Sequence, residues 1–251
     1  MNNITLIGSG NVATHLGLAL LQAGYNIKQV WSKKLKNAND LAKKLNSTAT
    51  NSLDKITDAD LYIIAVKDDK LNSLIKQLNF ENIIHTSGSI GLETFSKKLK
   101  NYGVFYPLQT LNKKVILNFK ATPIIIEASN ICFKNKLMQI GNNLTETVIS
   151  MNSKQRKQLH IAAVFACNFT NHMFTIADNI LAKNKLEFKL LEPLIHQTVK
   201  KINQNTPSEV QTGPAKRKDK NIINDHIKNL TDPKTKEIYK LISDSIMERN
   251  G

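Results

Sequence analysis

Short runs of apolar residues alternate with helical patterns over the first 150 residues of the chain. Residues 4–7 form the first run, a glycine-containing turn and a helical pattern follow, and residues 27–31 form the next run. Residues 61–66 are apolar without interruption, which is typical of a parallel strand covered on both faces. Further runs occupy residues 82–85, 103–106 and 122–127. Strands that alternate with helices predict an α/β fold with a Rossmann-type, doubly wound and mostly parallel sheet.

The pattern changes near residue 151, beyond which strand-type runs disappear. Residues 153–182 predict one long helix with apolar side chains on almost every side, and such a helix is expected to be buried. Three further helices are predicted at residues 188–203, 219–230 and 236–247. We therefore predict two domains, an α/β domain over residues 1–150 and an all-helical domain over residues 151–251.

The turn after the first run has the sequence GSGNVA at residues 8–13, which is a GxGxxA pattern. Gly8 permits a tight turn, and Gly10 has no Cβ atom that would keep the backbone away from a diphosphate. The helix that follows offers free N–H groups and a partial positive charge at its start. The order of strand, glycine turn, helix and strand favours a dinucleotide site over a plain structural turn. The residues predicted to hold the diphosphate are Gly8, Ser9, Gly10, Asn11 and Val12.

The end of the next strand bears on the identity of the dinucleotide. NAD sites usually carry Asp or Glu about 20 residues beyond the glycines, where it binds the ribose 2′-hydroxyl. Here Ser32, Lys33 and Lys34 occupy that place, and no acidic residue is present. A hydroxyl group and cations suit a 2′-phosphate, so NADP(H) is the predicted cofactor and Ser32 and Lys33 are its predicted ligands. The alternative is that both lysines are solvated surface charges of a lysine-rich chain.

Three more segments are expected at the carboxyl ends of the parallel strands, where ligands of such sheets bind. They are residues 66–68, 85–88 and 106–110. From these segments we predict cofactor contacts by Val66, Lys67, His85 and Ser87. His85 would lie near the nicotinamide, or alternatively would be a structural residue of the strand end.

A stripe of polar residues on the long predicted helix is the candidate for the chemistry. Arg156, His160, Asn168, Asn171 and His172 fall within about 160° of the helix surface if each residue turns by about 100°. An imidazole, with an ordinary pKa of about 6.5, can supply a proton at neutral pH, and an Asn can orient a carbonyl group. Any one of these residues could instead cap a helix or satisfy a core hydrogen bond. Together they predict one wall of a substrate cleft, with His160, Asn168 and His172 as catalytic residues.

A second candidate for substrate binding lies in the predicted loop TGPAKRKD at residues 212–219. Gly-Pro favours a fixed turn, and Arg217 is one of only three arginines in the chain. Its guanidinium group could bind a substrate carboxylate through two parallel hydrogen bonds. Asp219 is explained more simply as the N-cap of the next helix.

Composition limits the partners of the chain. Its 251 residues carry 35 Lys and Arg against 20 Asp and Glu, and the formal charge of +15 is in the range of nucleic-acid-binding proteins. The lysines are scattered in ones and twos without interleaved aromatic residues, so no nucleic-acid partner is predicted. No run reaches the ~18 apolar residues of a membrane span, so no membrane association is predicted. Two cysteines without metal-ligand spacing are typical of a reduced, cytoplasmic protein, and no metal site is predicted.

Five motifs carry a resemblance to a known family, in the order GSGNVA, HTSGS, FYPLQT, LHIAAVFACNFTNH and TGPAKRKD. With them the chain resembles bacterial proteins that pair a Rossmann-like domain with a helical domain of unknown function. That helical domain is similar to the C-terminal domain of the 6-phosphogluconate dehydrogenase superfamily. The first domain is also similar to those of pyrroline-5-carboxylate reductase and deazaflavin-dependent NADP reductase, and some family members resemble an alternative ketopantoate reductase. The resemblance implies an NADP(H)-dependent oxidoreductase that acts on a small carbonyl, imine or hydroxy-acid substrate.

The chain differs from the enzymes that it resembles in the residue that could donate a proton. The β-hydroxyacid and ketopantoate reductases carry a catalytic Lys with an Asn one turn later on the corresponding helix. Here Lys157 is followed by Ile161, and Asn168 is preceded by Val164. Because this pair does not transfer, a histidine of the stripe is predicted to donate the proton. The same departure supports an alternative function, a non-catalytic redox sensor that binds NADP(H).

The long apolar helix also bears on the assembly of the protein. A helix that is apolar on every side has more apolar surface than one small helical domain can cover. A second copy of the chain would provide the cover, so a homodimer is predicted.

Overall fold

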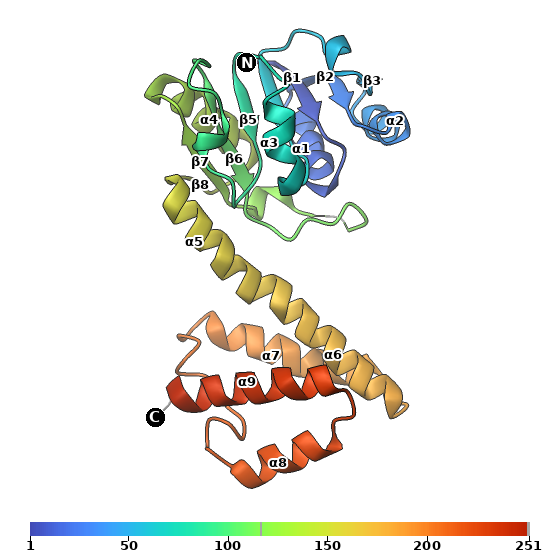
Figure 1. The fold of residues 1–251 in the computed structure, drawn as a ribbon, viewed down its shortest axis with the longest axis vertical. Coiled ribbons are helices and arrows are strands. Elements are labelled where there is room, and N and C mark those ends of the chain that lie inside the picture. Colours follow the sequence, from blue (N-terminus) through green and yellow to red (C-terminus); the bar gives the residue numbers. More distant parts are fainter. Residues whose placement is uncertain (116, 250–251) are drawn as a thin grey trace. The chain divides into compact units, whose positions relative to one another are not determined.

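The computed structural model describes residues 1–115 and 117–249 and divides the chain into two compact units. The first unit spans Met1–Phe169 and the second spans Thr170–Gly251. Figure 1 shows a sheet covered by helices in the first unit and helices connected by loops in the second. The two units therefore differ in how they form a core.

In the described part of the first unit, eight strands form one sheet in the order β3-β2-β1-β4-β5-β6-β7-β8. Neighbouring strands are parallel except for β6 and β7, which are antiparallel. From β1 the chain builds the sheet outward in both directions, as in a doubly wound fold. The strands are β1 (Asn3–Ile7), β2 (Asn26–Trp31), β3 (Thr48–Thr50), β4 (Leu61–Ile64), β5 (Ile83–His85), β6 (Tyr102–Pro107), β7 (Ile124–Ala128) and β8 (Val148–Ser150).

Strand β4 shows why a continuous apolar run becomes a central strand. Leu61 and Ile63 pack in a core cluster with residues of α1, α2 and α4, whereas Tyr62 and Ile64 pack in a second cluster with residues of α3. Successive side chains of a strand point to opposite faces, so a strand covered on both faces must be apolar throughout. The covering helices are α1 (Asn11–Gln22), α2 (Leu35–Lys44), α3 (Asp68–Ile75) and α4 (Ile131–Leu144).

The predicted fold class is confirmed: a Rossmann-type, mostly parallel sheet precedes a helical region. The sequence pattern does not reveal the two edge strands of the sheet. β3 has the sequence TAT and β8 the sequence VIS, and each is too short to show an apolar period. The reversal of direction between β6 and β7 is also invisible in the pattern, because it depends on pairing between strands.

Helical backbone continues without interruption from Ser153 to Lys183, as α5 (Ser153–Ala163), the π-helical segment η4 (Val164–Phe169) and α6 (Thr170–Lys183). Within a single chain, the predicted burial of this region is found only at Arg156 of α5. Neither η4 nor α6 buries a residue, and the side chain of Phe165 is 66% exposed. Apolar side chains on every side of a helix predict that other elements pack around it. The described residues of a single chain do not bury the side chains of η4 and α6.

The end of the sheet and the end of the first compact unit do not coincide. β8 ends at Ser150, where the predicted first domain ends, whereas the compact unit extends to Phe169. Glu127 on β7 explains the difference, because its carboxylate accepts hydrogen bonds from the N–H group of Ser153 at 2.8 Å and from the hydroxyl group of Ser153 at 2.7 Å. The start of α5 is therefore attached to the sheet.

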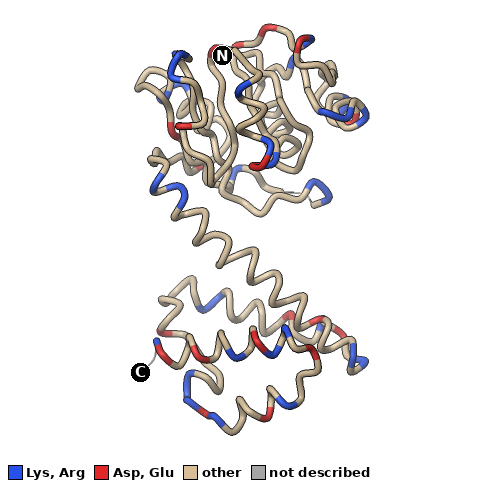
Figure 2. The backbone as a smooth tube through the Cα atoms, in the orientation of Figure 1, with Lys and Arg blue, Asp and Glu red and all other residues tan. Residues whose placement is uncertain are grey.

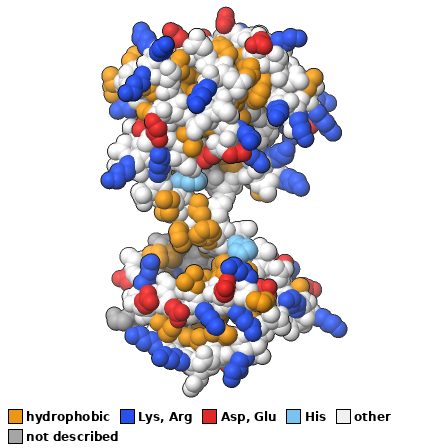
Figure 3. Space-filling model, in the orientation of Figure 1, with side chains coloured by type: hydrophobic (Ala, Val, Ile, Leu, Met, Phe, Trp, Pro, Cys, Tyr) orange, Lys and Arg blue, Asp and Glu red, His pale blue; other side chains and the backbone are white. Residues whose placement is uncertain are grey.

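The second unit is helical and buries few of its own side chains. Among its described residues only Ala215, Ile223 and Ser243 are buried, while Leu241 is 72% exposed. Figure 3 shows hydrophobic side chains on the surface of its helices. None of the described helices is long and apolar enough to cross a membrane. Besides α6, the helices are η5 (Phe188–Leu191), α7 (Glu192–Ile202), α8 (Lys220–Asn229) and α9 (Pro233–Arg249).

Charged residues are distributed over the surface of both units. Figure 2 shows lysines and arginines on most helices and loops, together with acidic residues, and no continuous basic stripe along one element. The net positive charge is therefore spread over the described chain.

Candidate active site

The turn between β1 and α1 accepts only glycine at its first position. Gly8 has φ +132°, and its N–H group donates to the Trp31 carbonyl oxygen at 2.8 Å. A Cβ atom on Gly8 would lie 2.1 Å from the carbonyl oxygen of Ala65. The turn is thus held between the ends of β2 and β4, which places the start of α1 at the carboxyl edge of the sheet.

Gly10 leaves open space next to the first turn of α1. A Cβ atom on Gly10 would meet no atom within 4 Å. No side-chain hydrogen bond caps the start of α1, and its first turn contains no acidic residue. The N–H groups of this turn, with their partial positive charge, therefore begin next to the open space at Gly10. This arrangement suits a diphosphate, so the residues from Gly8 to Val12 fit the predicted dinucleotide.

The predicted ligands of the 2′-phosphate begin beside the glycine turn. The hydroxyl oxygen of Ser9 lies 2.9 Å from that of Ser32, and the N–H group of Ser32 donates to the Thr50 carbonyl at 3.1 Å. Ser32 is buried and Lys33, directly after it, is exposed. The structure brings Ser9 and Ser32 together, while contact of Ser32 and Lys33 with a 2′-phosphate stays a prediction.

His85 does not face an open cleft. Its side chain has no exposed surface, and its ring stacks on Phe95 with the ring centroids 5.4 Å apart. Burial, and secondly the charge of Arg156, lower the pKa of His85 to about 3, so the imidazole is neutral at physiological pH. A cofactor cannot touch a side chain without exposed surface. The prediction that the His85 side chain contacts the cofactor is therefore wrong, because β5 is covered on both faces.

The other predicted residues of the β4 and β5 ends lie in connected loops. The hydroxyl oxygen of Ser87 accepts hydrogen bonds from the N–H groups of Ser89 and Ile90, both at 3.1 Å, so it stabilises the turn after β5. Ser89 in turn donates to Asp68 at 2.9 Å, which joins this turn to the start of α3. Val66 is half-buried and Lys67 is exposed. Their contact with a cofactor, and that of Ser87, stay predictions.

Tyr106 and His160 form a hydrogen-bonded pair that sequence reasoning missed. The hydroxyl oxygen of Tyr106 lies 2.9 Å from Nδ1 of His160, and the two rings meet edge to face. A Cβ atom on Gly88 would lie 2.7 Å from Nδ1 of His160 and 2.8 Å from Cζ of Tyr106. The absence of a side chain at Gly88 therefore leaves the space in which the pair forms. The position of Tyr106 near the carboxyl end of β6 is the signal in the sequence that points to it.

The hydroxyl group of Tyr106 suits both charge states of the imidazole. Burial raises the pKa of Tyr106, and the negative charge of Asp68 raises it further, so the hydroxyl group keeps its proton at neutral pH. It can donate to Nδ1 of a neutral imidazole and accept from the Nδ1–H group of an imidazolium. The ring of His160 is therefore held in one orientation whether or not it is protonated.

The polar stripe of the predicted long helix does not form one open wall. Arg156 is completely buried, pairs with Glu127 and donates to the carbonyl oxygen of Ile90. Its role is to attach α5 to the sheet. Asn168 is exposed and lies in η4, where a π turn holds more residues than an α turn. The spacing of about 100° per residue that aligned Asn168 with His160 does not hold there, and a catalytic role for Asn168 stays a prediction.

Two predicted catalytic residues belong to the second unit. His172 on α6 and Arg217 in the segment before α8 are both exposed. Gly213 has φ +104°, which shapes the turn in that segment, and the Asp219 side chain accepts the Ile222 N–H group at 3.2 Å as the N-cap of α8. The chemical roles of His172 and Arg217 stay predictions.

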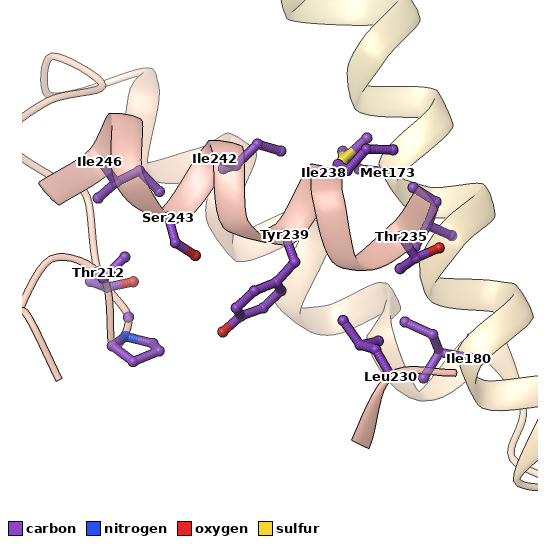
Figure 4. Close-up of a pocket in the computed structure, with 14 residues that line it drawn as sticks. Met173, Ile180, Thr212, Leu230, Thr235, Ile238, Tyr239, Ile242, Ser243 and Ile246 are labelled. Atoms are coloured by element: carbon purple, nitrogen blue, oxygen red, sulfur yellow. The ribbon is translucent and has the colours of Figure 1, made fainter. Parts of the chain in front are cut away.

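An apolar pocket lies within the second unit, with a volume of about 260 Å³. Figure 4 shows side chains of α6 and α9 converging on it, together with residues of the segment that precedes α8. Tyr239 gives the pocket a polar group, and its hydroxyl group is 2.8 Å from Nδ1 of His226. Other lining residues are Met173, Ile180, Thr212, Leu230, Ile238 and Ile242. The space could accommodate a small apolar group.

The Rossmann-type sheet and its glycine turn are typical of the class of dinucleotide-binding proteins. Residues 3–87 match the family model described as "NADP oxidoreductase coenzyme F420-dependent", and residues 122–246 match "Domain of unknown function (DUF2520)". A crystal structure of a candidate NADP oxidoreductase from Bacteroides fragilis is 40% identical, with a TM-score of 0.93 over 99% of this chain and 98% of that one. The chain therefore belongs to this family of NADP oxidoreductases with a C-terminal DUF2520 domain. The cofactor of the family is NADP(H).

More distant structures share the fold. The pyrroline-5-carboxylate reductase of Streptococcus pyogenes is 15% identical, with a TM-score of 0.63 over 99% of this chain and 97% of that one. An imine reductase from Myxococcus stipitatus in complex with NADP+ is 16% identical, with a TM-score of 0.69 over 98% of this chain and 92% of that one. No curated protein sequence matches the chain. These likenesses extend over both units.

Proposed function

We propose that the protein is an NADP(H)-dependent reductase of a small carbonyl or imine substrate, with His160 as the proton donor and Tyr106 as its positioning partner. The observation that supports this assignment is the 2.9 Å contact between the Tyr106 hydroxyl group and Nδ1 of His160. NADPH, when bound, supplies the hydride from its nicotinamide ring. Reduction of a carbonyl or imine group consumes one hydride and one proton, and the proton would come from the imidazolium of His160.

The geometry of the pair supports a different role for each nitrogen of the His160 ring. Tyr106 occupies Nδ1, so Nε2 is the nitrogen that would face the substrate. After Nε2 gives up its proton, the ring keeps its Nδ1–H group, which Tyr106 accepts. The imidazole therefore stays in place when its charge changes, and it can take up a new proton from solvent.

The surroundings of Lys157 support a histidine rather than a lysine as the proton donor. The ammonium group of Lys157 lies 3.2 Å from a carboxylate oxygen of Glu93, and both side chains are exposed. Lys157 is thus engaged at the surface, and Ile161, one turn later, cannot replace the missing Asn. We propose small 2-oxo acids, ketopantoate among them, and cyclic imines as the substrate classes, with Arg217 as the ligand of a substrate carboxylate and Asn168 and His172 as further catalytic residues.

A substrate panel followed by NADPH absorbance tests the proposal. We expect turnover of at least one 2-oxo acid or cyclic imine, and a loss of about 10²–10⁴-fold in kcat for His160→Gln. Tyr106→Phe should lower kcat less than His160→Gln does, because the imidazole remains but loses the partner that orients it. Both variants should bind NADPH as the unchanged protein does, and His196→Gln, at an exposed histidine of the second unit, is the matched control.

The same panel separates catalysis from redox sensing. Tight NADPH binding without turnover of any substrate would contradict the reductase and favour the sensor. Full activity of His160→Gln would contradict the assignment of the proton donor while leaving the reductase intact. Equal fluorescence changes of NADPH and NADH on binding would contradict a preference for the 2′-phosphate.

A further inference from the structure

The segment between β6 and β7 passes over the start of α1. Its backbone is attached there at two points: Nε2 of His15 donates to the carbonyl oxygen of Asn112 at 3.0 Å, and the N–H group of Lys113 donates to the side-chain oxygen of Asn11 at 3.2 Å. Asn11 is the first residue of α1, in the turn that faces the open space beside Gly10. We call residues 109–115 the strap.

The strap contains a hydrogen-bonded turn, and residues before and after it are anchored to the first unit. The side-chain oxygen of Asn112 accepts the Lys114 N–H group at 3.0 Å, and its carbonyl oxygen accepts the Val115 N–H group at 2.9 Å, which forms a tight turn around Lys113. On one side the N–H group of Leu108 donates to the Pro123 carbonyl oxygen at 2.8 Å. On the other side Phe119 is buried in the core cluster that contains the α1 residues. Two hydrogen bonds therefore attach the strap to α1, one from His15 and one to Asn11.

These contacts place the backbone of Lys113 next to the first turn of α1, where the diphosphate is predicted to bind. The backbone nitrogen of Lys113 is 3.2 Å from Asn11 Oδ1, and Lys113 is exposed, so its ammonium group can extend along the first turn of α1 on its flexible four-carbon stem. The first turn of α1 contains no basic residue. A diphosphate bound there would be held by backbone N–H groups alone unless another element supplies a positive charge.

We propose that Lys113 binds the cofactor diphosphate, and that His15 and Asn11 position it by holding the strap on α1. The inference rests on the family cofactor and on the proposed function. It extends that function because it makes the loop between β6 and β7 part of the cofactor site. The expected ligand group is the diphosphate, which NADPH and NADH share, and not the 2′-phosphate, which only NADPH carries.

Binding titrations with both dinucleotides test the assignment directly. NADPH and NADH are titrated by fluorescence into the unchanged protein, Lys113→Ala, Lys33→Ala and the control Lys136→Ala. Lys136 is exposed on α4 and borders a hollow with Met1 and Gly24, away from the glycine turn. We expect Lys113→Ala to weaken both dinucleotides by the same factor, about fivefold to tenfold. Lys33→Ala should weaken NADPH alone, and Lys136→Ala should weaken neither.

A double-mutant cycle tests the positioning role of His15. His15→Ala should weaken NADPH binding about twofold to threefold, as expected when one positioning hydrogen bond is lost. It should have no further effect in the Lys113→Ala background, because His15 acts through the strap. His15→Gln keeps a side-chain N–H donor and should restore part of the affinity. Thermal unfolding of each variant shows whether the fold is intact.

The outcomes distinguish this inference from the proposed function. Lys113→Ala with unchanged affinity for both dinucleotides would overturn the role of Lys113 and leave the reductase intact. A loss confined to NADPH would overturn the diphosphate assignment, because it would locate Lys113 at the 2′-phosphate. Independent, additive effects of His15→Ala and Lys113→Ala would overturn the positioning role. If the unchanged protein bound neither dinucleotide, the inference and the proposed function would both be overturned.

Discussion

At the scale of single residues, the two glycines of the turn have different roles, one in folding and one in the predicted binding of the cofactor. Gly8 is required by the backbone, because its φ of +132° and the nearby Ala65 carbonyl oxygen exclude a side chain. Gly10 has φ −81° and free space around its Cβ position, so the fold alone would accept alanine there. Gly10 keeps open the space in which the diphosphate is predicted to bind.

Alanine substitutions at the two glycines are predicted to affect different properties, stability at Gly8 and NADPH binding at Gly10. Gly8→Ala should lower the free energy of unfolding by about 3 kcal/mol or more, because strain and steric overlap add. Gly10→Ala should leave thermal stability nearly unchanged and weaken NADPH binding by about tenfold, since its methyl group would occupy the diphosphate space. Thermal unfolding and NADPH titration of both variants provide the measurement. Unchanged NADPH affinity of Gly10→Ala would contradict the location of the diphosphate.

The buried imidazole of His85 predicts an acid-dependent loss of stability. Its pKa is lowered to about 3 in the folded protein and is about 6.5 in an unfolded chain, so the unfolded chain binds this proton first as the pH falls. The contribution of neutral His85 is therefore fully present above about pH 6.5 and declines toward pH 3, by up to about 1.4 kcal/mol per pH unit. Urea unfolding at about pH 7 and about pH 4.5 should show a smaller loss for His85→Gln than for the unchanged protein. Equal losses would show that His85 does not titrate on unfolding.

At the scale of elements, the attachment of α5 decides where the first unit ends. Arg156 is completely buried and its charge is balanced by Glu127 on β7, whose carboxylate also accepts both hydrogen bonds from Ser153. A buried charge that loses its partner is costly, whereas removal of both charges costs less. The ion pair therefore specifies the position of α5 on the sheet, and with it the position of His160 beside Tyr106.

Substitutions of the ion pair should be strongly coupled. Glu127→Ala should lower the free energy of unfolding by about 3–5 kcal/mol, because it leaves Arg156 buried without a counter-charge. The double variant Glu127→Ala with Arg156→Met should lose less than the sum of the two single variants. Urea unfolding of the four proteins measures the coupling. Additive losses would mean that the two residues stabilise α5 independently.

The sequence pattern predicts a helix or strand where the residue types follow directly from the burial of that element. It does not predict features that depend on contacts between residues far apart in the sequence. The apolar run at residues 61–66 predicts β4 because both faces of that strand are covered. The pair of Tyr106 and His160 spans 54 residues of sequence and cannot be read from either segment alone. The π-helical turn at Val164–Phe169 has no periodic signature, so a spacing of about 100° per residue does not predict which face the residues beyond it occupy.

At the scale of the whole molecule, the helical surface of the second unit indicates association. Among the described residues of this unit only three side chains are buried, and exposed apolar residues occur on α6, α7 and α9. Exposed apolar surface of this extent is typical of an interface between proteins. We propose that a second copy of the chain covers it, because identical helical units provide matching apolar surfaces.

Light scattering is the measurement for the proposed homodimer. The expected mass is twice the 28.2 kDa of one chain. Leu241→Glu introduces a charge at a 72% exposed apolar position of α9 and should shift the protein toward the monomer. Lys240→Glu, at the exposed neighbouring position, is the matched control and should leave the mass unchanged. A monomer at all concentrations would contradict the proposal.

The reversal of direction between β6 and β7 has a consequence for how the enzyme could be engineered. A parallel neighbour would require the chain to return to the opposite edge of the sheet through a crossover, usually a helix packed in the core. Because β7 is antiparallel to β6, their connection begins and ends at the edge of the sheet that carries the carboxyl ends of the parallel strands. Most of residues 109–115 are exposed, so their length and composition could be varied without repacking the core. On the proposed role of Lys113, libraries directed at this connection should change how long a dinucleotide stays bound while the sheet remains unchanged.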